Sequence, residues 1–166
     1  MIKSLFYSTK IKVWEIGIMI FYVLLSVELF FFLRFAEGET QNHCLYMYTF
    51  FTQLFLYSLF YRAMRNLKVY IFCFTIGILH LFLYYLLKEN ATLIGLKNNV
   101  VISLRNTIIL LILFQILRFV SLKTQKQELV GVGRNNKDVH STREITRIDI
   151  ILEVTYIATA FILLCL

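Results

Sequence analysis

Long apolar runs, separated by short charged segments, constrain this chain more than any other feature of its sequence. An α-helix rises about 1.5 Å per residue, so about 20 residues span the roughly 30 Å hydrocarbon core of a bilayer. We therefore predict an all-α, integral membrane bundle of five transmembrane helices that forms a single domain, residues 1–166. The predicted helices cover residues 13–33, 44–61, 69–87, 100–122 and 142–166.

The composition agrees with a membrane protein and argues against a nucleic-acid partner. Hydrophobic residues make up 59% of the chain, whereas soluble domains contain about 45–50% apolar residues. The net charge of +7 would suit nucleic acid, but the basic residues lie between apolar runs and not in one stripe with interleaved aromatic residues. We therefore expect these charges to orient the chain in a lipid bilayer with anionic headgroups.

The distribution of lysine and arginine predicts the orientation in the membrane. With the N-terminus inside, thirteen of these residues fall on the inner side and four on the outer side. Such a positive-inside bias predicts an N-in/C-out topology. The first apolar run is too long for a typical signal-peptide core and ends without a small-residue cleavage site, so we interpret it as a retained membrane helix.

The residue usage also bears on the kind of membrane. Phe, Ile, Leu and Asn are abundant and proline is absent, which is compatible with an AT-rich genome. We expect a bacterial inner (cytoplasmic) membrane, with an organellar inner membrane as the alternative. The absence of proline also favours unbroken helices over the interrupted helices of many transporters.

The longest polar segment is the predicted inner loop, residues 123–141. Ser141 and Glu144 fit a capping box, so we expect the fifth helix to begin near Thr142. The basic residues of the loop and its flanks are expected to contact anionic headgroups or a docking partner. They are Lys123, Lys126, Arg134, Lys137, Arg143 and Arg147.

Several polar or charged residues fall inside the predicted helices, where they are costly unless they pair or face a wet cavity. They are Glu28, Gln53, His80, Arg105, Gln115, Arg118, Asp149 and Glu153. Counting about 1.5 Å per residue places Glu28 and Arg105 at a similar depth, where these two residues could pair. Asp149 and Glu153 share one helical face on the inner side, at about the depth of Arg118.

Two interpretations of these groups remain open. In the first, they make hydrogen bonds between helices, worth about 0.6–2 kcal/mol each, and the arginines extend to the interfaces. In the second, the inner acids form a proton or cation site and His80 acts as a ligand or relay. We favour the first. No second axial ligand matches His80, and the cysteines lack C-x-x-C spacing, so we expect no metal and no cofactor.

No catalytic constellation is present in the sequence: there is no nucleophile elbow, no H-E-x-x-H and no Walker sequence. An enzyme acting on lipids is therefore the weakest hypothesis. Our first hypothesis is a non-catalytic, structural or accessory subunit of a larger membrane protein complex, with other membrane protein subunits as partners. The alternative is a small transporter or ion- or proton-conducting protein. It would use Glu28 and Arg105 as an outer gate and an inner site formed by Arg118, Asp149 and Glu153.

Overall fold

The computed structural model describes residues 10–35, 38–58, 60–89, 101–131 and 143–165. These residues form five α-helices and one short 3-10 helix, so the all-α prediction is confirmed. In chain order the elements are α1 (Val13–Phe35), α2 (Gly38–Ser58), η1 (Ala63–Arg65), α3 (Leu67–Leu87), α4 (Ile102–Gln125) and α5 (Arg147–Cys165).

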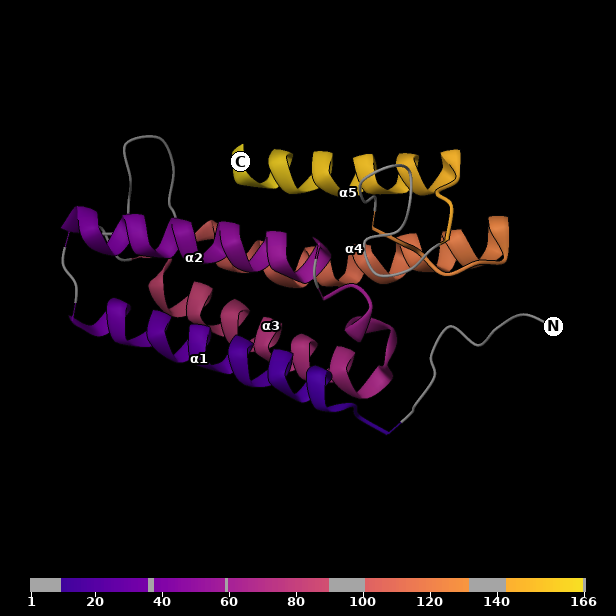
Figure 1. Cartoon of the computed structure of the whole chain (residues 1–166). Coiled ribbons are helices and arrows are strands. Elements are labelled where there is room, and N and C mark those ends of the chain that lie inside the picture. Colours follow the sequence, from indigo (N-terminus) through magenta and orange to yellow (C-terminus); the bar gives the residue numbers. More distant parts are fainter. Residues whose placement is uncertain (1–9, 36–37, 59, 90–100, 132–142, 166) are drawn as a thin grey trace.

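The five α-helices run side by side, and successive helices alternate in direction (Figure 1). α1, α3 and α5 begin at the end of the bundle where α2 and α4 finish. We call this the basic end, because many exposed cations lie in the segments that meet there. They are Lys10, Lys12, Arg62, Lys68, Lys123, Lys126 and Arg147.

The central helix of the bundle is α4, which packs against α2, α3 and α5. Half of its most apolar stretch is buried, compared with 11% for α1. Large side chains such as Leu111 and Phe114 are fully enclosed in the core. The peripheral helix α1 buries only a narrow stripe, Glu15, Tyr22 and Leu29, whose members are two turns apart. Most of the surface of α1 therefore faces outward.

Three of the helices, α1, α3 and α4, are long and apolar enough to cross a membrane. Their outward-facing side chains are largely apolar; Leu24 and Phe82, for example, are 61% and 60% exposed. A water-soluble surface of this kind would be unusual, because contiguous exposed apolar patches mark contact with lipid or protein. The apolar outer surfaces of these helices therefore indicate a membrane protein.

The helix α2 begins at Gly38, six residues before the predicted start, and ends at Ser58. The polar residues of the expected turn form the first turns of this helix, where unpaired backbone N–H groups favour polar side chains. Gln41 also reaches back, donating from Nε2 to the carbonyl oxygen of Leu33 at 2.8 Å. That bond satisfies one of the free carbonyls near the end of α1 and joins the two helices.

The predicted start of the fifth helix near Thr142 is wrong, because α5 begins at Arg147. Ser141 lies outside the described residues, and Glu144 is exposed and precedes the helix. The helix start is instead stabilised by Thr146 and Asp149, three residues apart like the members of a capping box. The Thr146 amide donates to Asp149 Oδ2 at 3.0 Å, and the Asp149 amide donates to Thr146 Oγ1 at 3.2 Å.

The segment that follows α4 folds back onto the bundle. Lys126 adopts a left-handed conformation, φ 53°, which ends the helix and reverses the chain. Leu129, Val130 and Gly131 are then buried. A Cβ atom at Gly131 would lie 3.2 Å from the Tyr61 ring, so only glycine leaves this contact unstrained. The first part of the predicted polar loop is thus a packed element of the fold.

Candidate functional site

A buried arginine pairs with an acid at the basic end of the bundle. Arg118, on α4, is fully buried, with a side-chain exposure of 0%. Its Nε atom donates to Glu128 Oε2 at 2.8 Å, and its Nη2 atom donates to Glu128 Oε1 at 3.0 Å. This is a bidentate, charge-assisted pair, which is the strongest geometry available to arginine. Arg118 therefore does not extend to the interface, as a snorkelling side chain would.

The short helix η1 is attached to this ion pair. Arg118 Nη1 donates to the carbonyl oxygen of Arg65 at 3.4 Å, and Arg65 Nε lies 3.9 Å from Glu128 Oε2. Arg65 also donates to the carbonyl oxygen of Leu129. Gln115 Nε2, one turn before Arg118, donates to the carbonyl oxygen of Met64 at 3.4 Å. The connection between α2 and α3 is thus fastened to α4 and to the segment that follows it.

A second network surrounds Asp149 at the start of α5, where this carboxylate is fully buried. Arg143 Nη2 donates to Asp149 Oδ2 at 2.8 Å, and Gln125 Nε2 donates to Asp149 Oδ1 at 2.7 Å. The Thr146 hydroxyl donates to Gln125 Oε1 at 2.6 Å. Arg143 also donates to the carbonyl oxygen of Glu128, which joins the two networks. Together, these residues form what we call the basal polar cluster: Arg65, Arg118, Gln125, Glu128, Arg143, Thr146 and Asp149.

The basal polar cluster differs from the inner site expected from the sequence. Depth alone grouped Arg118 with Asp149 and Glu153, but each of the first two residues has its own partner of opposite charge. Glu153 lies half-buried on α5, one turn beyond Asp149. Arg143, which we expected at headgroups or a partner, instead neutralises a buried acid. The cluster joins four segments of the chain through pairs of opposite charge. This arrangement is typical of a site that stabilises the fold.

Glu15 forms a separate contact at the same end. Only 5% of this residue is exposed, and its Oε2 atom accepts from the Lys12 amide at 2.8 Å and from Asn66 Nδ2 at 3.3 Å. Asn66 is the N-cap of α3, where its side chain accepts from the Lys68 amide at 3.3 Å. Glu15 therefore ties the start of α1 to the start of α3.

A buried hydrogen-bond chain crosses the middle of the bundle. The hydroxyls of Ser26 on α1 and Tyr48 on α2 lie 2.9 Å apart, and the Tyr48 hydroxyl lies 2.9 Å from His80 Nε2 on α3. The Tyr22 ring also meets His80 edge-on, with ring centroids 6.1 Å apart. His80 Nδ1 and the Tyr22 hydroxyl are buried and have no hydrogen-bond partner among the described residues. His80 thus lies in the core as a link between three helices.

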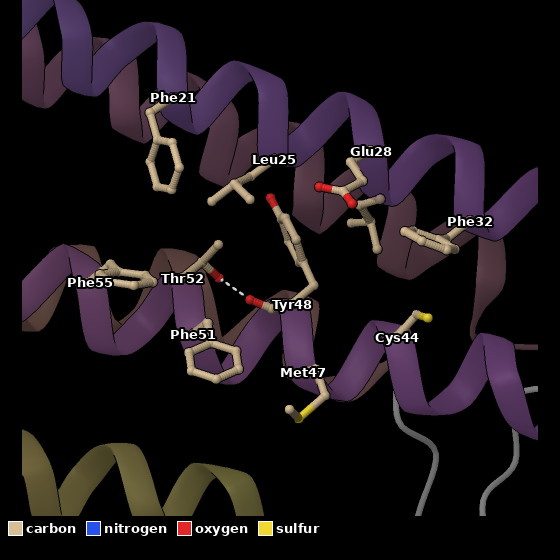
Figure 2. Close-up of a pocket in the computed structure, with 11 residues that line it drawn as sticks. Phe21, Leu25, Glu28, Phe32, Cys44, Met47, Tyr48, Phe51, Thr52 and Phe55 are labelled. Carbon is tan, nitrogen blue, oxygen red and sulfur yellow. Dashed lines mark hydrogen bonds between the residues drawn. The ribbon is translucent and has the colours of Figure 1, made fainter.

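An apolar groove lies between α1 and α2, with a volume of about 430 Å³. Figure 2 shows side chains of both helices converging on it, with the Tyr48 ring between them. The lining residues are Phe21, Leu25, Glu28, Leu29, Phe32, Cys44, Met47, Tyr48, Phe51, Thr52 and Phe55. Glu28 supplies the only charge in this lining, and its side chain is exposed. We call this feature the α1–α2 groove.

The predicted pairing of Glu28 with Arg105 is not formed. Arg105 lies on α4 with its guanidinium carbon 6.0 Å from the centre of the Tyr84 ring, a cation–π contact with α3. None of the ion pairs between described residues includes Glu28. Counting residues gives a depth for each group, but it cannot give the side of the helix on which each group lies.

The remaining predicted residues are placed as follows. Lys123, Lys126 and Arg147 are exposed at the basic end, where a headgroup or partner could reach them. Arg134 and Lys137 lie outside the described residues, as does the side chain of Gln53.

Sequence reasoning missed Glu128 as the partner of Arg118, although a signal was present. Glu128 opens the sequence Glu-Leu-Val-Gly-Val inside an otherwise polar loop. Two branched apolar residues beside an acid, ten positions after a buried arginine, indicate a segment that returns to the core. The structure confirms this return for Leu129 and Val130, which are 1% and 3% exposed.

The chemistry available to these sites is ion pairing and apolar contact. Among the described residues, no group of three or more His, Cys, Asp or Glu side chains is arranged to hold a metal ion. The α1–α2 groove combines aromatic walls with one exposed carboxylate, which suits a ligand or partner that is apolar and carries a positive charge. Comparison with protein families, with curated proteins and with solved structures finds no match to this chain.

Proposed function

We propose that the chain is a non-catalytic subunit of a larger membrane protein complex, with five transmembrane helices in an N-in/C-out orientation. Two observations support crossings by α2 and α5. Both helices run alongside the three strongly apolar ones (Figure 1). The outer face of α5 is also apolar, since Ile151 and Phe161 are more than half exposed. Its 19 residues would extend about 28 Å, close to the hydrocarbon thickness.

The observation that carries the proposal is the exposed carboxylate of Glu28. An acid that faces hydrocarbon is costly, and acids within membrane helices therefore pair or face a wet cavity. The fully buried charges of Arg118 and Asp149 are neutralised within the chain. Glu28 has no such partner among the described residues, so the missing positive group belongs to another molecule. A subunit that docks against α1 and α2 would supply it.

The basic end of the bundle supports the proposed orientation of the chain in the membrane. Lys123, Lys126 and Arg147 are exposed there, and the positive-inside rule places such a surface on the cytoplasmic side. Each basic residue near an anionic leaflet contributes about 1 kcal/mol of attraction. We propose the bacterial inner membrane as the location, with an organellar inner membrane as the alternative.

The proposal is tested by isolating the tagged chain from native membranes in a mild detergent and identifying associated proteins by mass spectrometry. We expect a stoichiometric membrane protein partner. The Glu28→Gln variant should lower the yield of that partner, because it removes the charge that the partner neutralises. Glu39→Gln is the matched control, since Glu39 is an exposed acid on α2 outside the groove. A chain that is isolated alone in both native and cross-linked membranes contradicts the proposal.

The buried chain of Ser26, Tyr48 and His80 favours a second candidate function, proton conduction. Tyr48 lines the groove that holds Glu28, so a proton path from Glu28 toward His80 has a geometric basis. Measurement of proton flux in proteoliposomes separates the two candidates. A conducting protein loses flux in both Glu28→Gln and His80→Gln. A subunit shows no flux above that of empty vesicles.

A further inference from the structure

We propose that the α1–α2 groove is the seat of a single transmembrane helix of a different protein, which carries a lysine or arginine that pairs with Glu28. This inference rests on the proposed function and names the chemistry of the partner.

The groove has the length of a helix contact. Its lining extends from Phe21 to Phe32 on α1 and from Cys44 to Phe55 on α2, which is a separation of eleven residues along each helix. Eleven residues correspond to about 16 Å, or three helical turns. A small cationic molecule would fill one turn of such a trough, whereas a helix lying along it would contact both walls over their whole length.

The charge of the groove determines which kind of partner can bind there. The walls are aliphatic and aromatic, and the single carboxylate of Glu28 lies among them. A lipid acyl chain would cover the walls but would leave that carboxylate without a counter-charge, which is unfavourable in hydrocarbon. A helix that carries one lysine or arginine at this depth satisfies both requirements.

Away from the helix ends, the described helices of a second copy do not offer the required cation. Within the middle of the described helices, the arginines are Arg105 and Arg118. Arg105 lies over the Tyr84 ring and Arg118 is fully buried against Glu128, so neither is available on an outer face. The basic partner is therefore a different protein.

The wall of the groove is already rigid before a partner binds. The Tyr48 hydroxyl is held between Ser26 and His80, so the ring that divides the two helices is fixed at its far end. Figure 2 shows the Tyr48 ring between α1 and α2, with Thr52 one turn away hydrogen-bonded to the Tyr48 carbonyl at 2.8 Å. A preformed surface binds a helix with a smaller loss of conformational entropy.

The test uses the purified full-length chain in zwitterionic lipid vesicles together with synthetic transmembrane peptides. The chain contains one tryptophan, Trp14 at the start of α1, which serves as the fluorescence donor. One peptide is a leucine–alanine helix with a central lysine and a dansyl group at each end, and its control has leucine in place of the lysine. Energy transfer from Trp14 to dansyl, titrated against peptide density, gives the affinity of each peptide.

We expect the lysine peptide to bind at least about tenfold more tightly than the leucine peptide, which corresponds to the gain from one neutralised acid. Glu28→Gln should abolish this preference, and Glu39→Gln should retain it. Leu25→Lys should also abolish it, because a lysine three residues before Glu28 on the same helix face neutralises the acid internally. Circular dichroism of each variant verifies that the helix content is unchanged.

Two results would overturn the inference. One is equal binding of the two peptides to the unmodified chain. The other is Glu28-dependent binding of tetraphenylphosphonium, a lipophilic cation, without binding of the lysine peptide, which would assign the groove to a small molecule. Failure of the subunit proposal gives a different result, in which the unmodified chain is isolated alone from native membranes, whereas a failure of the groove assignment alone leaves a native partner that co-purifies.

Discussion

At the scale of single residues, Arg118 shows how this fold accommodates a charge in its core. Both oxygens of Glu128 accept from its guanidinium, and the Arg65 carbonyl accepts from the remaining Nη1. The desolvation cost of a buried ion is large, and a bidentate partner with further hydrogen bonds offsets it. The pair contributes specificity, because its bidentate geometry fixes both side chains relative to each other.

Glu128→Gln tests the importance of this pair. The substitution leaves the Arg118 cation buried without a counter-charge, so we expect a loss of about 3–5 kcal/mol in the free energy of unfolding. The double variant Arg118→Leu/Glu128→Leu should recover part of that loss, because it removes both charges. The measurement is reversible unfolding in mixed micelles with increasing SDS, followed by circular dichroism.

The control for that measurement is Glu89→Gln, which breaks the exposed pair between Lys88 and Glu89. An exposed ion pair is worth about 0–1 kcal/mol, so this variant should unfold almost like the unmodified chain. Equal effects of the two substitutions would contradict a special role for the basal polar cluster.

The residue scale also shows what the sequence could predict of the candidate sites. Glu28, His80, Arg118 and Asp149 were identified because a polar group inside an apolar run is expensive in a membrane. Their partners were not, because a residue count gives the height of a side chain along the bundle and not its direction around the helix. The partner of Arg118 lay in a loop whose fold is decided by tertiary packing.

At the scale of the helices, α3 and α4 pack closely together at Gly77. A Cβ atom there would lie 3.1 Å from Leu111 Cδ1 and 3.7 Å from the Ile108 Cα atom. Small residues let helix backbones come close enough for extensive van der Waals contact, which is a main source of helix association in membranes. The central position of α4 depends on this contact.

Gly77→Val should therefore separate α3 from α4. We expect a loss of about 1–3 kcal/mol in the free energy of unfolding from overpacking at this crossing. Gly17→Val on α1 is the matched control, since nothing lies within 4 Å of a Cβ atom at Gly17. The same SDS titration measures both variants, and a Gly17 variant that loses as much as the Gly77 variant would refute the role of the close contact.

The start of α5 supports a third prediction. Thr146→Ala removes the hydroxyl that accepts from the Asp149 amide and donates to Gln125, so we expect a loss of about 1 kcal/mol. Thr155→Ala is the control, because this exposed threonine on α5 bonds only to the carbonyl of the preceding turn, at Ile151. Hydrogen exchange of the α5 amides should accelerate in the first variant and not in the second.

The positions of the helices were predictable to different degrees. The starts of α1 and α3 were predicted to within two residues, because a sharp change from polar to apolar residues marks them. The start of α5 lies five residues after its predicted position, because the reciprocal hydrogen bonds at the start of this helix are made by Thr146 and Asp149. The start of α2 lies six residues before its predicted position, because polar side chains at a helix N-terminus hydrogen-bond to free backbone amides. Hydropathy cannot distinguish such a polar first turn from a loop.

At the scale of the whole molecule, most exposed cations of the described residues lie at one end of the bundle. Seven of them and the basal polar cluster share the end where α1, α3 and α5 begin, whereas Arg34 and Lys88 lie at the opposite end (Figure 1). The opposite half contains the exposed carboxylate of Glu28 in the α1–α2 groove. This division supports one orientation in a membrane and one lateral face for a partner.

Reporter fusions test the proposed orientation. A C-terminal alkaline phosphatase should be active and a C-terminal green fluorescent protein dark, because five crossings place the C-terminus outside. The same fluorescent protein at the N-terminus should be bright. An active phosphatase at both ends, or at neither, would contradict an odd number of crossings.

The ion pair of Arg118 also has a consequence for biosynthesis. Arg118 and Glu128 are only ten residues apart in the chain, so this pair can form without any residue of α5. Arg143 and Asp149 lie later in the chain, and they can pack against a base in which Arg118 already has its counter-charge. The order of synthesis thus matches the order in which the cluster can be assembled.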